Sequence, residues 1–321
     1  MSEMRIFDLH CDTLLEMYLK NKKLTELNGH INLEKLEKGG ALVQCFAAFL
    51  PTHGAAEEDG VTMPPYELFN AMADLFDAQM AAYPDKIAPA RSIADIKRNA
   101  ADGKISAMLT VEDTVLLEGK IERVDELYRR GVRMAALTWN YENSLGFPNS
   151  ADPAQHAREL KYFGLEAVSR MNELGIIVDV SHLSEGGFWS VAGHSTRPFA
   201  ASHSCARALC DHSRNLTDAQ LRAIAEHGGV CGVNFYSAFL TGSNYTANAD
   251  IVRHMQYIKN AAGIATVVLG SDFDGIDCEL ELRDYSHFDE LISAMSRAFT
   301  DDEIDLILNG NALRVFKDAV G

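Results

Sequence analysis

The chain has 321 residues and is acidic, with 46 aspartate and glutamate residues against 29 lysine and arginine residues and a formal net charge of −17. This balance, with no lysine- and arginine-rich run, argues against nucleic acid as a partner, because nucleic-acid binders need a positive surface. Hydrophobic residues make up 47% of the chain, which is enough for the core of one large domain over residues 1–321.

The sequence predicts a cytoplasmic protein without membrane contact. Its start, MSEMRIFDLHCDT, lacks the basic-then-apolar pattern of a signal peptide. No apolar stretch approaches the roughly 20 residues that a membrane helix needs. The six cysteines form no C-x-x-C pair, and we expect them to be free thiols: Cys11, Cys45, Cys205, Cys210, Cys231 and Cys278.

Eight short apolar runs predict strands. In chain order they are residues 6–12, 41–50, 105–113, 132–140, 175–182, 198–204, 230–235 and 266–275. Most of them are nearly continuous in apolar residues, which is typical of parallel strands that are buried on both faces.

Amphipathic stretches between these runs predict helices. The spacing of apolar residues indicates helices over 66–83, 158–174 and 249–262. Thr217 with Gln220, and Thr300 with Glu303, form capping boxes that predict helices over 218–227 and 301–309. Eight strands that alternate with helices predict a single (β/α)8 TIM-type barrel. The alternative is an open doubly wound sheet, but no G-x-G-x-x-G motif follows any predicted strand.

Residues of metal-ligand type end five of the predicted strands. They are His10 and Asp12 (strand 6–12), Glu112 (105–113), His182 (175–182), His203 (198–204), and Asp272 and Asp274 (266–275). The active site of such a barrel lies at the carboxyl ends of its strands, so these side chains are expected to converge on one rim. Each has an ordinary explanation alone, as a polar strand end or a helix cap, but their convergence favours a shared metal site.

The H-x-D spacing of His10 and Asp12 places both side chains on one face of a strand and turns Cys11 toward the helices. Imidazole and carboxylate ligands suit Zn²⁺ or a similar divalent ion. Five ligands are too many for one catalytic zinc with an open position, and they fit two ions that share a carboxylate. Glu112 is the expected bridge, because it lies between the other two pairs in the chain.

At this point the sequence resembles the membrane (renal) dipeptidase family, which comprises zinc dipeptidases on amidohydrolase-like barrels. The resemblance covers nearly the whole chain. Its segments are DLHCDT (8–13), LTVED (109–113), RMAALTWN (133–140), MNELGIIVDVSH (171–182), ASHSCARALCDHSRNLTD (201–218), GSDFDG (270–275) and GNALRVF (310–316).

The resemblance implies a role for each matching residue. His10 and Asp12 bind one Zn²⁺, His182 and His203 bind the second, and Glu112 bridges the two and belongs to the catalytic set. Asp272 is the catalytic acid and base, Arg214 binds the substrate carboxylate, and Asn215 supports its loop as part of the substrate site. Many family members have a histidine where this chain has Trp139, so Trp139 is the substrate-binding position at which specificity is expected to differ.

The function implied is hydrolysis of dipeptides by a hydroxide that bridges the two metal ions. Broad specificity, tolerance of a D-residue at the C-terminal side and a homodimer are expected by analogy. One alternative is another amidohydrolase, acting on a lactone, a cyclic amide or a deamination substrate, although such barrels usually open with H-x-H. A second alternative is a barrel that binds metal without catalysis, and only Trp139 favours it.

Overall fold

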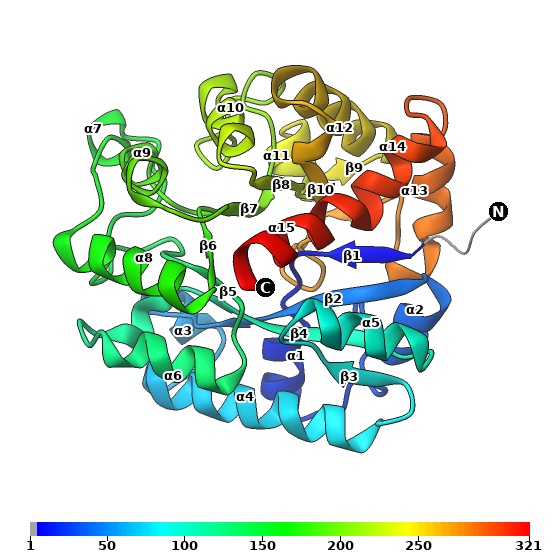
Figure 1. Ribbon diagram of the computed structural model, residues 1–321, viewed down its shortest axis with the longest axis horizontal. Helices are drawn as coiled ribbons and strands as arrows, with labels where there is room; N and C mark the ends of the chain where they lie inside the picture. The colour runs from blue at the N-terminus through cyan, green and yellow to red at the C-terminus, as the bar shows by residue number, and fades with distance from the viewer. Residues whose placement is uncertain (1–4) are drawn as a thin grey trace.

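A computed structural model describes residues 5–321 and closes eight parallel strands into a barrel (Figure 1). The first four residues of the start discussed above lie outside the described residues. The barrel strands are β1 (Ile6–Asp8), β2 (Ala41–Phe49), β4 (Ile105–Glu112), β5 (Met134–Ala136), β6 (Ile177–Asp179), β7 (Ala200–Ser204), β8 (Val230–Val233) and β10 (Val267–Leu269). The ring closes because β1 pairs with both β10 and β2, and β2 pairs with β4. The predicted (β/α)8 barrel is therefore confirmed.

Each predicted strand contains one barrel strand, but several barrel strands are shorter than predicted. The run 266–275, for example, is a strand only over Val267–Leu269. Three further strands were not predicted. β3 (Ile87–Pro89) pairs with the start of β4, and β9 (Tyr245–Thr246) pairs with β11 (Glu279–Leu280) outside the barrel. These segments are too short to show a periodic pattern in the sequence.

Helices surround the barrel on its outside (Figure 1). They are α1 (Thr13–Lys20), α2 (Leu33–Lys38), α3 (His53–Glu58), α4 (Pro65–Ala82), α5 (Ile93–Ala101), α6 (Glu122–Arg130), α7 (Pro153–His156), α8 (Tyr162–Leu174), α9 (Glu185–His194), α10 (Asp218–Glu226), α11 (Ser237–Leu240), α12 (Asn248–Ala262), α13 (Phe288–Met295), α14 (Asp301–Asp305) and α15 (Asn311–Val320). Short 3₁₀ turns are η1 (Thr114–Leu117), η2 (Ile264–Thr266) and η3 (Tyr285–His287).

Both predicted capping boxes are present. Thr217 begins α10 and Thr300 begins α14, and each accepts a hydrogen bond from the backbone N–H three residues later. The helix predicted over 301–309 is α14 followed by a π-helical turn, η4 (Leu306–Gly310).

The last helix closes one end of the barrel. Figure 1 shows α15 lying across the middle of the ring. Val315 and Phe316 of α15 pack in one apolar cluster with Phe7 and Met108, whose side chains come from β1 and β4. A second, larger apolar cluster joins the strands to the surrounding helices. The carboxyl end of the strands is therefore the end at which a site can open. Within residues 5–321, no helix has both the length and the apolar character of a membrane span.

Candidate metal centre

The five predicted ligands and Asp272 come to the carboxyl end of the barrel, and all six are buried. Asp274 does not join them, because its carboxylate accepts hydrogen bonds from Thr13 Oγ1 and the His30 N–H. Glu112 is the last residue of β4 and His203 lies in β7, whereas His182 and Asp272 each lie three residues beyond their strands, β6 and β10. The segments after β1 and β10 continue to pair, because the Asp272 N–H donates to the carbonyl of His10 and the Asp12 N–H to that of Phe273. This pairing holds His10 and Asp12 beside Asp272.

The backbone leaves the strands sharply at this end. Among residues 5–321, seven non-glycine residues have a left-handed backbone, and four of them surround the site: Asp113 (φ 62°), His182 (φ 67°), Asp272 (φ 62°) and Asp274 (φ 66°). Each such residue costs of order 1–3 kcal/mol, and strain of this kind gathers at functional sites. Of these four, His182 and Asp272 have side chains that face the other predicted site residues.

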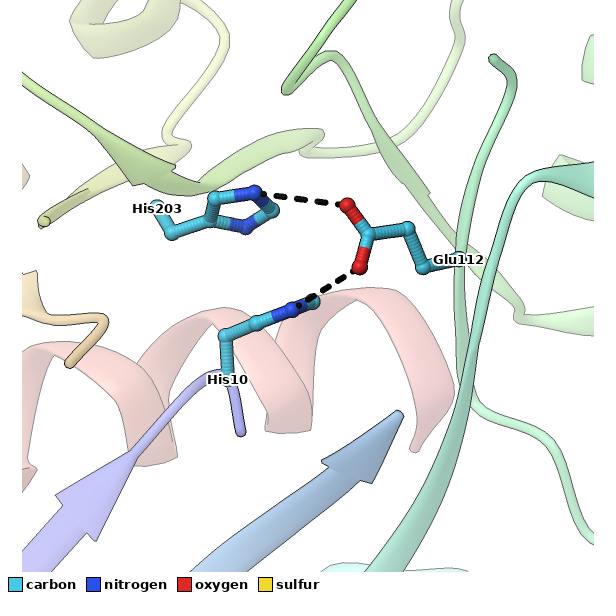
Figure 2. Close-up of side chains that lie close together, drawn as sticks. All are labelled: His10, Glu112 and His203. Carbon is cyan, nitrogen blue, oxygen red and sulfur yellow. Dashed lines mark ion pairs between the residues drawn. The ribbon is translucent and has the colours of Figure 1, made fainter. Parts of the chain in front are cut away.

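The Glu112 carboxylate lies between His10 on one side and His203 on the other (Figure 2). Its Oε2 is 3.1 Å from His10 Nε2, and its Oε1 is 2.9 Å from His182 Nε2 and 3.6 Å from His203 Nε2. The two carboxylate oxygens thus face different groups, as a shared ligand would.

His182 and His203 each have an unprotonated Nε2 atom, and the two atoms face each other in the site. His182 Nδ1 lies 3.0 Å from Asn140 Oδ1, an acceptor, so Nδ1 carries the proton. His203 Nδ1 lies 2.7 Å from Ser202 Oγ, which donates its own proton to Asp179 and so accepts from the ring. Burial lowers the pKa of His182 to about 4 and that of His203 well below its ordinary value, so both rings are neutral.

The two Nε2 atoms lie 3.0 Å apart. With both protons held at Nδ1, neither nitrogen can donate to the other. Two lone pairs at this distance repel each other unless a cation accepts them, so these residues fit a metal ion.

The second half of the site is crowded with carboxylates. Asp12 Oδ2 and Asp272 Oδ1 lie 3.5 Å and 3.7 Å from His10 Nε2. Burial raises the pKa of Asp12 to about 8; the charge of His10 opposes this rise and that of Glu112 adds to it. Asp12 Oδ1 and His10 Nε2 are buried without a hydrogen-bond partner. Buried carboxylates in this arrangement need a positive charge, and a second metal ion fits here.

Gly275 packs directly on this half. A Cβ at Gly275 would lie 2.0 Å from Asp12 Oδ2 and 2.9 Å from Asp272 Oδ1, closer than atoms can approach. Only glycine leaves room for both carboxylates.

A cavity of about 320 Å³ leads to the centre. Asp12, Glu112, His182 and Asp272 lie among its lining residues, and its walls include Trp139, Phe49, Tyr236, Phe239 and Ile276. The ring centroid of Trp139 lies 4.8 Å from that of Phe49 and 6.2 Å from that of His182. Trp139 is therefore part of the wall beside the predicted ligands.

Arg214 and Asn215 lie next to this cavity and do not line it. The Arg214 guanidinium donates to the His203 carbonyl at 3.3 Å and lies 5.3 Å from the ring centroid of Phe239, a wall residue. Its Nε is buried without a hydrogen-bond partner, and no ion pair among residues 5–321 includes the Arg214 side chain. The Asn215 amide donates to the carbonyls of Cys210 and Phe239, so it ties its own loop to α11.

Two asparagines were missed in the sequence. Asn140 holds His182, and Asn234 Nδ2 donates to Asp272 Oδ2 at 2.8 Å. Both lie near the ends of predicted strands, 132–140 and 230–235, so the rule that selected the predicted ligands could also have selected them. Asp179 orients His203 through Ser202, from whose hydroxyl it accepts a hydrogen bond, and only the fold shows that contact.

Comparisons with known proteins agree with this geometry. A family model described as membrane dipeptidase (peptidase family M19) matches residues 1–320. Dipeptidase aclJ of Aspergillus oryzae is 32% identical over 302 residues, which cover 91% of this chain and 71% of that protein.

Two solved structures also match. One is described as the dipeptidase AC, a metallopeptidase, with 26% identity, a TM-score of 0.90 and full coverage of both chains. The other is a metallopeptidase from Rhodobacter sphaeroides liganded with a phosphinate mimic of the dipeptide L-Ala-D-Ala. It has 26% identity and a TM-score of 0.90 over 99% of this chain and 100% of that one.

Proposed function

The chain belongs to the membrane dipeptidase family, peptidase family M19, and on that premise we propose that it hydrolyses dipeptides with two divalent metal ions, most simply Zn²⁺. The observation that carries the proposal is the position of Glu112. Its two oxygens face His10 on one side and His182 with His203 on the other. A carboxylate so placed suits a bridge between two ions.

In this proposal His10, Asp12 and Glu112 hold one ion, and Glu112, His182 and His203 hold the other. Neutral imidazoles and carboxylates are the ligands that Zn²⁺ takes in hydrolytic sites. When bound, a pair of such ions supplies a water nucleophile at neutral pH and polarises the scissile carbonyl. Asn140 and Ser202 keep the two histidine rings in the tautomer that binds metal, since each accepts the Nδ1 proton.

The proposed proton carrier is Asp272. Its Oδ1 faces the centre, and its Oδ2 accepts from Asn234, which fixes the direction of the carboxyl group. Burial raises the pKa of Asp272 above its ordinary value, which makes it a better proton acceptor. Asp272 can therefore hold a proton at Oδ1 and deliver it to the leaving amine.

The proposed carboxylate-binding residue is Arg214. A guanidinium binds a carboxylate through paired hydrogen bonds, and the unpartnered Nε of Arg214 lacks an acceptor that a substrate carboxylate would supply. Burial is the main cause of the lowered pKa of His182, and the charge of Arg214 lowers that pKa further. Binding one end of a dipeptide there sets the position of the peptide bond.

We also propose broad specificity with tolerance of a D-residue at the C-terminal side. The Rhodobacter sphaeroides relative, whose ligand mimics L-Ala-D-Ala, supports this stereochemistry. Trp139 and Phe49 contact each other in the aromatic wall of the cavity, so side-chain preferences of this protein are expected to depend on them.

The test combines metal content with a rate panel on the same sample. Metal is counted by mass spectrometry, and hydrolysis is measured over L,L and L,D dipeptides and over lactones. We expect about two ions per chain, hydrolysis of both dipeptide series, and no turnover of lactones. A protein that bound no divalent ion on titration, or that hydrolysed lactones and no dipeptide, would contradict the proposal.

A further inference from the structure

The loop that carries Arg214 is closed at its base by backbone contacts. Ala206 and Leu216 form an isolated parallel bridge, and the Arg207 N–H donates to the Leu216 carbonyl at 2.8 Å. Arg214 lies near the end of this loop, defined here as residues 206–216. Its position depends on what holds the residues on either side of it.

Arg207 contacts both of those neighbours. Its Nε donates to the carbonyl of Asn215 at 2.9 Å, and its Nη2 donates to the carbonyl of Ser213 at 3.0 Å. The two carbonyls flank Arg214 in the chain. One planar guanidinium therefore fixes the backbone immediately before and immediately after Arg214.

Arg207 is itself held from outside the loop. His156 Nε2 lies 3.1 Å from Arg207 Nη2, and the Glu185 carboxylate lies 3.6 Å from Nη1. Burial, followed by the charge of Arg207, lowers the pKa of His156, so its ring is neutral and adds no positive charge beside Arg207. These contacts come from α7 and α9, which are separate from the loop.

The outer side of the loop faces a surface cavity. Asp211, His212 and Ser213 line this cavity of about 800 Å³ together with Trp189 and other residues. This side of the loop is held by hydrogen bonds and by the ring of His212, whose centroid lies 4.7 Å from that of Phe239. A further hydrogen bond runs from Ser213 Oγ to Asn149 Oδ1 at 2.7 Å, and the Asn149 N–H donates to the His182 carbonyl at 2.7 Å.

We propose that Arg207 is a positioning residue that holds Arg214 in place for the carboxylate of the substrate. The inference rests on the proposed role of Arg214. Lysine cannot replace Arg207 in this role, because an ammonium group lacks the planar pair of donors that spans two carbonyls. Loss of Arg207 leaves the charge of Arg214 intact but no longer fixes the orientation of its guanidinium. Binding of the substrate carboxylate is then weaker, and the rate of the chemical step is unchanged.

The experiment compares substrates and inhibitors that differ only in the carboxylate. Arg207→Lys and Arg207→Met are assayed with a dipeptide and with its C-terminal amide, and are titrated with a phosphinate dipeptide mimic and its amide. We expect the KM of the dipeptide and the Ki of the acid mimic to rise about tenfold or more. We expect kcat, metal content, and the Ki of the amide mimic to stay within about twofold of the parent values.

Two further variants sharpen the result. Arg253→Lys, at an exposed arginine on α12 paired with Asp250, is the matched control and should change nothing. In an Arg214→Lys background, Arg207→Lys should have no further effect on the dipeptide, because the residue that it positions is already lost.

Equal losses for the acid and the amide, or an unchanged KM in a folded Arg207→Lys protein, would overturn the inference. Failure of the proposed function is a different result, in which the parent protein itself hydrolyses no dipeptide. If Arg207→Met does not fold, Arg207→Lys carries the test, with its melting temperature measured beside the kinetics.

Discussion

At the scale of single residues, three side chains of the site have their second polar atom already engaged in a hydrogen bond. His182 and His203 each have Nδ1 hydrogen-bonded, and Asp272 has Oδ2 bonded to Asn234. The free atoms all face the centre. The structure thus separates the atoms that orient a side chain from the atoms that can act on a metal or substrate.

The proposed role of Asp272 predicts the behaviour of Asp272→Asn. The asparagine keeps the size of the side chain and removes its ability to accept a proton. We expect kcat for dipeptides to fall by about 10²- to 10⁴-fold with metal content unchanged. Stopped assays with metal analysis of the same sample check this, and hydrolysis at the parent rate would rule out the acid and base assignment.

Gly275 allows a test that leaves all proposed ligands in place. In Gly275→Ala the added Cβ would meet Asp12 Oδ2, so Asp12 must move. We expect metal affinity to fall by about 10- to 100-fold, measured by competition with a chromogenic chelator. The control is Gly193→Ala in α9, where an added Cβ meets nothing within 4 Å. Equal metal affinity in the two variants would show that Asp12 is not needed for binding.

At the scale of elements, two barrel strands end before the residues that they bring to the site, and those residues lie in the loops that follow. β6 ends at Asp179 and β10 at Leu269, and the left-handed residues His182 and Asp272 follow three positions later. Short strands with strained turns suit a rim on which many side chains must converge. Beyond the loops, capping residues mark where helices begin, as Thr217 does for α10.

The Thr217 cap predicts a measurable effect on stability. Thr217→Ala removes the side-chain acceptor of the Gln220 N–H at the start of α10. We expect the free energy of unfolding to fall by about 1 kcal/mol, measured by urea denaturation. Thr217→Ser keeps a hydroxyl that can cap, and it should stay near the parent value. A similar loss in both variants would assign the effect to packing of the threonine methyl group instead.

At the scale of the whole molecule, the barrel has one closed end and one charged end. α15 closes the amino end with apolar side chains, while three buried carboxylates, Asp12, Glu112 and Asp272, gather at the other. Burial raises the pKa values of Asp12 and Asp272, so the folded protein holds these charges at a cost unless cations bind. A cytoplasmic location and a homodimer stay predictions from the sequence and the family resemblance.

This arrangement predicts that metal stabilises the fold. Ligands that bind only the folded state stabilise it by about 4 kcal/mol when their concentration is 1,000 times Kd. We therefore expect chelation to lower the Tm by several degrees and added Zn²⁺ to restore it, as scanning calorimetry can measure. The same Tm with and without metal would mean that the carboxylates are accommodated without cations.

The sequence alone determined the strands, their alternation with helices, and which residues end them. Buried parallel strands appear in the sequence as continuous apolar runs, and helix caps appear as local motifs. The barrel and both capping boxes could therefore be predicted from the sequence. His10, Asp12, Glu112, His182 and His203 were found because they are polar residues at the ends of such runs. The dipeptidase function came from the family resemblance.

Only the tertiary structure decided how these residues meet. Three contacts leave no local pattern in the sequence. They are the 3.0 Å distance between the Nε2 atoms of His182 and His203, the contact of Gly275 with Asp12, and the hydrogen bonds of Arg207 to the carbonyls on both sides of Arg214. The strand ends also differ from prediction, because left-handed turns at His182 and Asp272 override strand propensity. Distances between segments far apart in the chain are set by closure of the barrel, and the order of residues along one segment does not contain them.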